Sequence, residues 1–198
     1  MNYLAHAYLS FNHEEILAGN MISDFVKGKK KFDFANGIQK GIALHRAIDI
    51  FTDTHKITHD AKQYLKPAVG LYAGAFIDIV YDHFLANDKN EFADDASLFS
   101  FVQNTYTSLE KNVAVFPERF QSMFPFMKQH NWLYNYRFNL EIGKSFGGLV
   151  RRAKYLTDST QAFEIFEKEY GHFKNYYELF FPELKKFTQQ QLQQMLAE

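Results

Sequence analysis

Apolar residues recur every three or four positions along nearly the whole chain. The runs 38–51, 71–84 and 163–177 each place Ile, Leu, Val, Phe or Tyr at that spacing. This is the period of an amphipathic α-helix, whereas the alternation typical of β-strands is nearly absent. The one hairpin-type dipeptide, Asn36-Gly37, has no strand pattern on either side. The sequence therefore predicts an all-α protein.

We expect about eight or nine helices packed as one helical bundle, a single domain over residues 1–198. No internal repeat or change of composition marks a domain border, and 198 residues suit one domain. Pro182 is expected to break or kink the last helix, because proline has no N–H to donate. The predicted helices cover residues 2–9, 14–27, 35–53, 57–66, 70–87, 97–113, 117–129, 138–155 and 159–194.

Composition narrows the class of protein further. Hydrophobic residues make up 46% and charged residues 23% of the chain, as in a soluble domain with a full core. The formal net charge of −1 gives no reason to expect a nucleic acid or a membrane as partner. The absence of cysteine excludes disulfides, a thiol nucleophile and thiolate metal ligands. No signal-peptide pattern or membrane-length apolar run is present, so we expect a cytoplasmic protein.

Aromatic residues are unusually frequent, with 22 Phe, 12 Tyr and 1 Trp, or 18% of the chain. They keep helical spacing and are densest after residue 98, so we expect most of them to form core. A minority, Tyr8, Phe25, Tyr81 and Phe84, flank the polar residues described next and are candidates to line a narrow channel.

Polar residues able to bind a metal ion gather in the first 85 positions, at intervals of four. Residues four apart share one helix face, with Cβ atoms about 5–6 Å apart, so two such side chains can hold one cation or phosphate. The last pair interrupts an apolar segment, where a carboxylate is costly to bury unless it is paired or metal-bound. The series consists of Asn20 and Asp24; His45, Asp49 and Asp53; and Asp78 and Asp82 followed by His83.

Two interpretations of this series stay open. The carboxylates could line solvated helix faces, which is the usual case for any one pair taken alone. Their recurrence on three long helices, two of them with His, favours a metal site between helices. A ligand set of oxygen and nitrogen without sulfur suits Mn²⁺, Fe²⁺, Mg²⁺ or Zn²⁺.

A run of lysines follows the predicted helix that carries Asp24. It consists of Lys27, Lys29, Lys30 and Lys31. The run is either a solvated loop or an electrostatic landing site for an acidic partner. Few aromatics interleave it, which disfavours reading of a nucleic-acid sequence.

Jointly, these motifs resemble the acyl carrier protein phosphodiesterase family. Their order and spacing match over roughly the first 90 residues. One departure is that His6 is followed by Ala7 and Tyr8, where the family has His-x-His. The matching segments are Asn2–His6, Gly19-Asn20, Asp24–Gly28, His45–Asp49, Thr52-Asp53, and Asp78 with Asp82–Leu85.

The resemblance implies an all-helical fold related to the HD-domain metal phosphohydrolases. It also implies hydrolysis of the phosphodiester that joins 4′-phosphopantetheine to a serine of acyl carrier protein, with Mn²⁺ as the usual cofactor; Mg²⁺ and Fe²⁺ are alternatives. Because that carrier protein is strongly acidic, the lysine run becomes its expected docking surface.

Residue chemistry and the resemblance together suggest individual roles. A divalent ion could lower the pKa of a bound water to near neutrality. Asp49 and Asp53 would orient histidines or act as general base, and Asp78 would support the ligands. Arg46 could clamp the phosphate, and Asn20 could hydrogen-bond a phosphate oxygen or a ligand. The expected metal ligands are His6, Asp24, His45, Asp82 and His83.

Two competing hypotheses remain at this point. The first is another HD-like phosphohydrolase, acting on a nucleotide or another small phosphodiester, in which the lysines would bind substrate phosphates. The second is a non-enzymatic helical binding module whose carboxylates cover a polar face. Metal content and the effect of Mn²⁺ on the melting temperature discriminate between enzyme and binding module.

Overall fold

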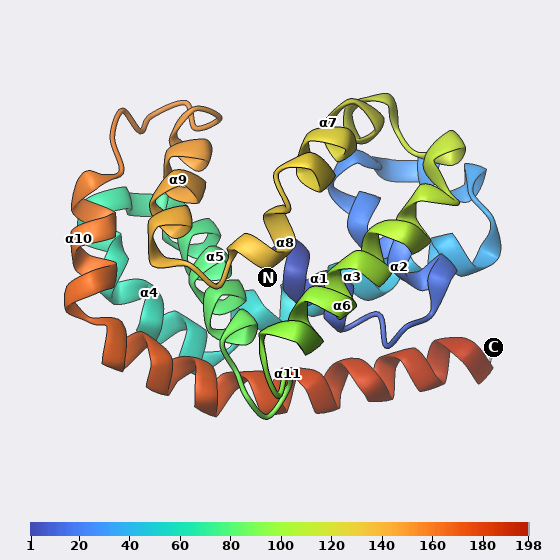
Figure 1. The fold of residues 1–198 in the computed structure, drawn as a ribbon. Helices are drawn as coiled ribbons and strands as arrows, with labels where there is room; N and C mark the ends of the chain where they lie inside the picture. The colour runs from blue at the N-terminus through green and yellow to red at the C-terminus, as the bar shows by residue number, and fades with distance from the viewer. Residues whose placement is uncertain (198) are drawn as a thin grey trace.

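The computed structural model describes residues 1–197, which form helices and connecting turns without any strand (Figure 1). The predicted all-α class is therefore confirmed. The α-helices are α1 (Tyr3–Tyr8), α2 (Glu14–Ile22), α3 (Asn36–Thr54), α4 (Lys56–Val69), α5 (Ala73–Ala86), α6 (Asp95–Glu110), α7 (Glu118–Gln129), α8 (Trp132–Asn135), α9 (Asn139–Val150), α10 (Thr160–Lys168) and α11 (Tyr170–Ala197). Four 3₁₀ turns join them: η1 (Ser23–Phe25), η2 (Gly28–Asp33), η3 (Gly70–Tyr72) and η4 (Val113–Val115).

The helices form two groups with α1 and α8 between them (Figure 1). One group contains α4, α5, α9 and α10, and the other contains α2, α3, α6 and α7. The long helix α11 runs along one edge and contacts α3, α4, α5 and α10, so it joins both groups. The short helix α1 contacts α2 and α5. Residues from both groups can therefore meet around α1.

The closest packing in the fold is between α2 and α3, and two glycines permit it. A Cβ built on Gly19 would lie 2.1 Å from the carbonyl oxygen of Ile38 and 2.9 Å from the Cα of Gly41. A Cβ on Gly41 would lie 2.3 Å from the carbonyl oxygen of Ile16. No side chain fits at either position, so the two backbones touch. This contact sets the distance between Asn20 on α2 and His45 on α3.

Helix α2 ends earlier than the sequence suggests. The hydrophobic pattern predicts a helix over 14–27, whereas α2 stops at Ile22 and continues as the 3₁₀ turn η1. His45 Nδ1 lies 2.7 Å from the Asn20 carbonyl oxygen. In a longer helix that oxygen would instead accept a hydrogen bond from the backbone N–H of residue 24. The turn places Asp24 beside His45 instead of continuing the α2 axis.

Helix α1 is held at its N-terminus by a carboxylate from α5. The side chain of Asp82 is fully buried and accepts backbone N–H groups of Asn2 (3.2 Å), Leu4 (2.7 Å) and Ala5 (3.3 Å). These donors have no partner within the helix itself. A carboxylate there also interacts favourably with the positive, N-terminal end of the helix dipole. Asp82 therefore fixes the helix that carries His6.

The C-terminal region differs from the prediction in two ways. The expected helix over 159–194 is divided at Glu169 into α10 and α11. Pro182 does not break α11, which continues to Ala197. Phe180, Phe181 and Leu184 around it are buried, so side-chain packing holds this helix together where one backbone hydrogen bond is missing.

Most of the aromatic side chains form core, as expected. Phe166, Phe173, Tyr177 and Phe180 are buried. Tyr81 is also buried and stacks on Phe180 with ring centroids 5.1 Å apart, so it does not line a channel. Residues 56–86 are long and apolar enough to cross a membrane by length and composition, but 61% of that window is buried, as in core helices of soluble proteins.

Candidate metal centre

Two helices bring two histidines and an aspartate together. His6 comes from α1, and His45 and Asp49 lie one turn apart on α3. One potential ligand atom from each of the three lies within 4.8 Å of the other two. Both histidines are buried, whereas the Asp49 side chain is 37% exposed. The cluster therefore has a buried nitrogen side and a partly open carboxylate side.

The carboxylate of Asp49 spans both imidazoles. Its Oδ1 is 3.2 Å from His6 Nε2, and its Oδ2 is 3.0 Å from His45 Nε2. Asp24 adds a second carboxylate, with Oδ1 3.2 Å from His45 Nε2. The Asp24 side chain is 71% exposed, so it lies at the outer edge of the cluster.

The hydrogen bonds behind the rings fix which nitrogen carries the proton. His45 Nδ1 faces the Asn20 carbonyl oxygen at 2.7 Å and must donate to it. His6 Nδ1 lies 2.8 Å from Asn20 Oδ1, while Asn20 Nδ2 lies 2.8 Å from the His6 carbonyl oxygen. A carbonyl only accepts, so the amide cannot be turned around, and His6 Nδ1 must also be the donor. The lone pairs of both rings thus belong to Nε2.

This arrangement leaves acceptors facing acceptors on the open side. With Nδ1 protonated, each neutral imidazole presents an Nε2 lone pair to a carboxylate oxygen of Asp49. Protonation of His45 alone resolves its own contact, but the His6 Nε2 lone pair still faces Asp49 Oδ1 and the Met1 carbonyl oxygen, each at 3.2 Å. Protonation of both rings is opposed by their stacking, with centroids 3.9 Å apart, where two positive charges repel. A divalent cation also resolves it, since both Nε2 atoms and a carboxylate oxygen are suitable ligands. The donor set thus fits such an ion.

The pKa values diverge as this geometry requires. Burial, and after it the neighbouring charge of His45, lower the pKa of His6 to about 4. Burial also opposes the charge on His45, but hydrogen bonds to Asp24 and Asp49 outweigh it and raise the pKa of His45 to about 9. Burial would raise the pKa of Asp49, yet His45 and His6 hold it well below its usual range. Without a metal ion, one proton on His45 is shared by two carboxylates.

A further cation meets the cluster from the chain terminus. The α-amino group of Met1 is 3.1 Å from Asp78 Oδ1 and 3.5 Å from Asp49 Oδ1. Burial lowers the pKa of this amine, but the carboxylates of Asp78 and Asp49 raise it to about 10. Asp78, expected to support the ligands, thus contacts the cluster through this amine. No sequence motif indicated the Met1 contact.

Two of the expected ligands lie elsewhere. Both oxygens of Asp82 face the N-terminus of α1, and burial raises the pKa of Asp82 to about 7 despite those N–H donors. His83 lies between the carbonyl oxygen of Tyr136 (2.7 Å) and the hydroxyl of Tyr170 (2.9 Å). In this structure the two side chains point to different partners and do not face one centre. The cluster includes Asp49, to which the sequence gives a supporting role, and neither of these two.

The remaining predicted residues have partners outside the two histidines and Asp49, or lie behind the histidine rings. Asp53 pairs with Lys62 on α4 at 2.7 Å and has no contact with either histidine. Arg46 donates from Nη2 to the Val26 carbonyl oxygen at 3.0 Å, which ties α3 to the segment entering the lysine run. Asn20 is fully buried behind the histidines, and its Oδ1 faces His6 Nδ1 at 2.8 Å.

The lysine run begins with Lys27 and continues into the exposed turn η2. Lys27, Lys29 and Lys30 are exposed and Lys31 is half-buried. Within residues 1–197, none of these four lysines lies within ion-pair distance of a carboxylate. Lys31 Nζ lies 4.9 Å from the ring centroid of Phe32, which is itself 62% exposed. The segment is an uncompensated basic surface that begins three residues after Asp24.

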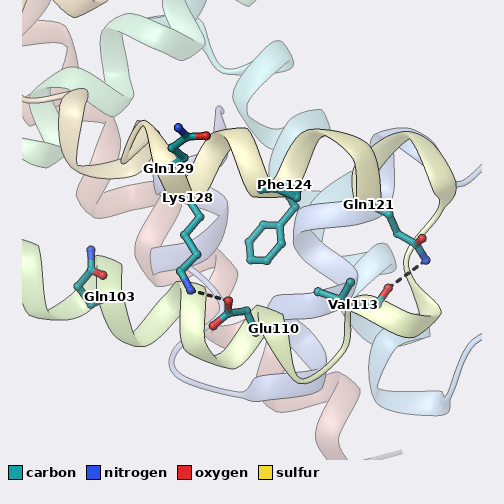
Figure 2. A pocket seen from close by; sticks show the side chains of 8 residues that line it. Gln103, Glu110, Val113, Gln121, Phe124, Lys128 and Gln129 are labelled. Atoms are coloured by element: carbon teal, nitrogen blue, oxygen red, sulfur yellow. Dashed lines mark hydrogen bonds and ion pairs between the residues drawn. The ribbon is translucent and has the colours of Figure 1, made fainter.

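A surface hollow lies apart from this cluster, between α6 and α7 (Figure 2). It has a volume of about 470 Å³ and is lined by Gln103, Glu110, Phe124 and Lys128, among others. Its two charged groups, Lys128 and Glu110, pair with each other at 2.5 Å. They therefore leave no free charged group to act on a ligand.

The fold and cluster define an all-helical protein with a buried pair of histidines and a bridging carboxylate suited to one divalent cation. A family model described as acyl carrier protein phosphodiesterase matches residues 1–184. The chain belongs to this family, an enzyme family of phosphodiester hydrolases.

Individual relatives are similar to the chain over more than nine-tenths of their length. The chain is 30% identical over 182 residues to an acyl carrier protein phosphodiesterase of Photorhabdus laumondii, covering 92% of each protein. It is 27% identical over 189 residues to one of Yersinia enterocolitica, covering 96% of this chain and 98% of the relative. One of Pectobacterium atrosepticum is 28% identical over 191 residues, covering 96% and 99%. No solved structure matches the chain.

Proposed function

We propose that this protein is a metal-dependent phosphodiesterase that releases 4′-phosphopantetheine from holo acyl carrier protein. Family membership supports the carrier protein as substrate. The observation that carries metal dependence is the pair of His Nε2 lone pairs directed at one carboxylate, Asp49. A cation resolves that arrangement and would bind the anionic phosphate of the substrate next to it.

The proposed ligands are His6 Nε2, His45 Nε2 and Asp49, with Asp24 at the open edge. Mn²⁺ suits this nitrogen and oxygen set, and Mg²⁺ and Fe²⁺ are alternatives. A divalent ion bound there would polarise a phosphoryl oxygen and lower the pKa of a coordinated water. The residues of the chain would hold this centre in place, because Asn20 fixes both rings and Asp82 fixes α1.

The reaction exchanges one phosphorus–oxygen bond for another. The oxygen of water bonds to phosphorus, the bond from phosphorus to the serine oxygen breaks, and that serine oxygen takes a proton. The products are the apo carrier protein and 4′-phosphopantetheine. Of the two residues expected as general base, Asp49 is here a proposed ligand and Asp53 is held by Lys62; the proton of the attacking water passes to solvent at the open side of the site. Arg46 is the proposed phosphate clamp; it donates to the carbonyl oxygen of Val26, which directly precedes the lysine run.

We further propose that the carrier protein docks on Lys27, Lys29, Lys30 and Lys31. Support comes from the exposure of this segment, from its lack of carboxylate partners within residues 1–197 and from its nearness along the chain to Asp24. An acidic protein would be attracted to it over several ångströms, which speeds encounter and orients the substrate. The substrate and this reaction would place the protein in the cytoplasm, in fatty acid biosynthesis.

Mass spectrometry of the carrier protein tests the reaction directly. Holo acyl carrier protein is incubated with the protein and Mn²⁺, and the carrier is then weighed. We expect loss of the prosthetic group, and no loss with a chelator or with the Asp49→Asn variant. His59→Ala, an exposed histidine on α4, is the matched control and should act like wild type. A carrier that stays intact with Mn²⁺, Mg²⁺ and Fe²⁺ would contradict the proposal.

A further inference from the structure

We infer that Asn20 is a positioning residue that fixes the ring tautomer of both histidines of the proposed metal site. The sequence suggests a hydrogen bond from Asn20 to a phosphate oxygen or to a ligand; its side chain is fully buried and faces His6, one of the proposed ligands. It lies on the Nδ1 side of the rings, opposite the carboxylates that face Nε2. The inference rests on the proposed metal site and adds a residue to it that touches no substrate.

Asn20 serves the two rings with different atoms. Its side-chain Oδ1 accepts from His6 Nδ1 at 2.8 Å, and its backbone carbonyl accepts from His45 Nδ1 at 2.7 Å. One residue therefore directs two Nε2 lone pairs to the same side. Acceptors placed behind metal-binding histidines set the tautomer and the ring orientation, and their loss typically reduces metal affinity about 10- to 100-fold.

The amide is itself prevented from rotating. Its Nδ2 donates to the His6 carbonyl oxygen at 2.8 Å and to Ser10 Oγ at 3.1 Å. Ser10 in turn donates from Oγ to the His6 carbonyl oxygen at 2.8 Å. Rotation of the amide would set its oxygen against that carbonyl, which is repulsive. The oxygen is thereby kept on the His6 side.

Two substitutions separate positioning from simple packing. Asn20→Ala removes the acceptor for His6 but keeps the backbone acceptor for His45. Asn20→Asp keeps an acceptor oxygen of the same shape in front of His6 Nδ1, although it buries a charge and, unless protonated, sets its second oxygen against the His6 carbonyl oxygen. A positioning role requires that Asn20→Asp binds metal much better than Asn20→Ala. A packing role requires the opposite, because an unpaired buried charge disturbs folding more than a small cavity does.

Zn²⁺ titration of the chelator-treated full chain by calorimetry measures this difference without any turnover. We expect Asn20→Ala to bind Zn²⁺ about 10- to 100-fold more weakly than wild type, and Asn20→Asp to bind it clearly more tightly than Asn20→Ala. Asn87→Ala is the matched control, because Asn87 Nδ2 also bonds a histidine carbonyl, that of His83, away from the cluster. It should bind like wild type. Equal affinity of Asn20→Ala and wild type, or an equal loss in Asn87→Ala, would overturn the inference.

A measurement on the unmodified protein covers the case in which Asn20→Ala fails to fold. Long-range ¹⁵N–¹H spectra of the Zn²⁺-loaded wild type report the proton position on each imidazole. We expect His6 and His45 both to carry it on Nδ1, and a proton on His6 Nε2 would overturn the inference. If wild type binds neither Zn²⁺ nor Mn²⁺, the proposed function fails first. If it binds them and the variants do not differ, only the role of Asn20 fails.

Discussion

The imidazole rings of His6 and His45 stack with their centroids 3.9 Å apart and their planes inclined by 15°. They come from α1 and α3, so this contact joins two segments that are far apart in the sequence. At this separation only one ring can be charged, and the two pKa values move to about 4 and about 9. Besides the proton on each Nδ1, the stacked pair therefore holds one additional proton, on His45, or, in the proposed function, faces one metal ion.

Removing a ligand should abolish metal binding without unfolding the protein. We expect His45→Ala and Asp49→Ala to lower Mn²⁺ affinity at least about 100-fold, because a three-ligand site loses an anchoring donor. Dialysis against a chelator should likewise abolish hydrolysis, and Mn²⁺ should restore it. Metal content and calorimetric titration check this. The control is His172→Ala, an exposed histidine on α11, whose variant should bind as wild type does.

The chelator-treated protein should lose stability as the pH rises from about 6.5 to 9. The pKa of His45 is raised to about 9 in the fold, whereas an unperturbed His titrates near about 6.5. The folded state therefore binds the extra proton over that range, and its stabilisation is fully present below about pH 6.5 and lost as the pH passes the folded value. The effect should be on the order of a few kcal/mol.

Urea unfolding at several pH values measures this loss, and His45→Gln gives the baseline, since Gln cannot take up the proton. Added Mn²⁺ should reverse the trend, because metal binding displaces the proton and becomes tighter as pH rises. A pH dependence in the chelator-treated His45→Gln variant as steep as that of wild type would refute the assignment.

Loss of the Asp82 carboxylate should destabilise α1 and weaken the metal site together. Asp82→Ala leaves three backbone donors of α1 unpaired in the interior, which should cost about 3 kcal/mol or more. Asp82→Asn retains one acceptor oxygen and should fall between. Urea unfolding gives the stability, and Mn²⁺ titration gives the effect on His6.

The matched control for this experiment is Asp94, which caps α6 at an exposed position by accepting the Ser97 N–H at 2.8 Å. Asp94→Ala should cost about 1 kcal/mol and leave metal affinity unchanged. If Asp82→Ala were no more damaging than Asp94→Ala, the anchoring role of Asp82 would be wrong.

Charge reversal on η2 should affect recognition of the carrier protein and not the chemical step. With Lys29→Glu and Lys30→Glu combined, we expect KM for holo acyl carrier protein to rise about tenfold or more with kcat unchanged. The salt dependence of kcat/KM should also become weaker. Lys168→Glu with Lys174→Glu changes the same number of charges on α10 and α11 and should leave KM unchanged. An unaltered KM in the η2 variant would disprove docking there.

The contact between α2 and α3 should tolerate no added methyl group. Gly19→Ala places a Cβ 2.1 Å from the Ile38 carbonyl oxygen, a backbone atom that cannot turn aside, so it should destabilise the fold by about 3 kcal/mol or more. Gly147→Ala, within α9 and with no atom near the added Cβ, should be neutral or stabilising by up to about 1 kcal/mol. Thermal unfolding of the two variants compares them, and equal stabilities would contradict this account.

Much of the fold could be predicted from the sequence, because helical periodicity records which face of each helix is buried. The end of α2 could not, since it depends on His45 taking the Asn20 carbonyl across a helix pair. Pro182 misled for a similar reason: packing of Phe181 and Leu184 keeps α11 continuous. The short helix α8 was not predicted at all, because four residues are too few to show a period.

The candidate site was predictable in composition and less so in assignment. Spacing by four placed His45 and Asp49 on one face, and the structure shows their side chains in contact. Spacing within one helix does not show which other helix packs against a given side chain. It therefore could not show that Asp82 on α5 faces the N-terminus of α1. Nor could it show which side of Asn20 is buried.

The exposure of the cluster is uneven, and this gives the proposed reaction an order. The histidine rings are covered, so solvent reaches the centre over Asp49 and Asp24, whose side chains are 37% and 71% exposed. A phosphodiester is an anion and is repelled at an entrance made of two carboxylates. A bound cation reverses the sign of that entrance. The enzyme would thus bind its partners in a compulsory order, the cation before the carrier protein, and excess carrier protein would not enter the site of the metal-free enzyme.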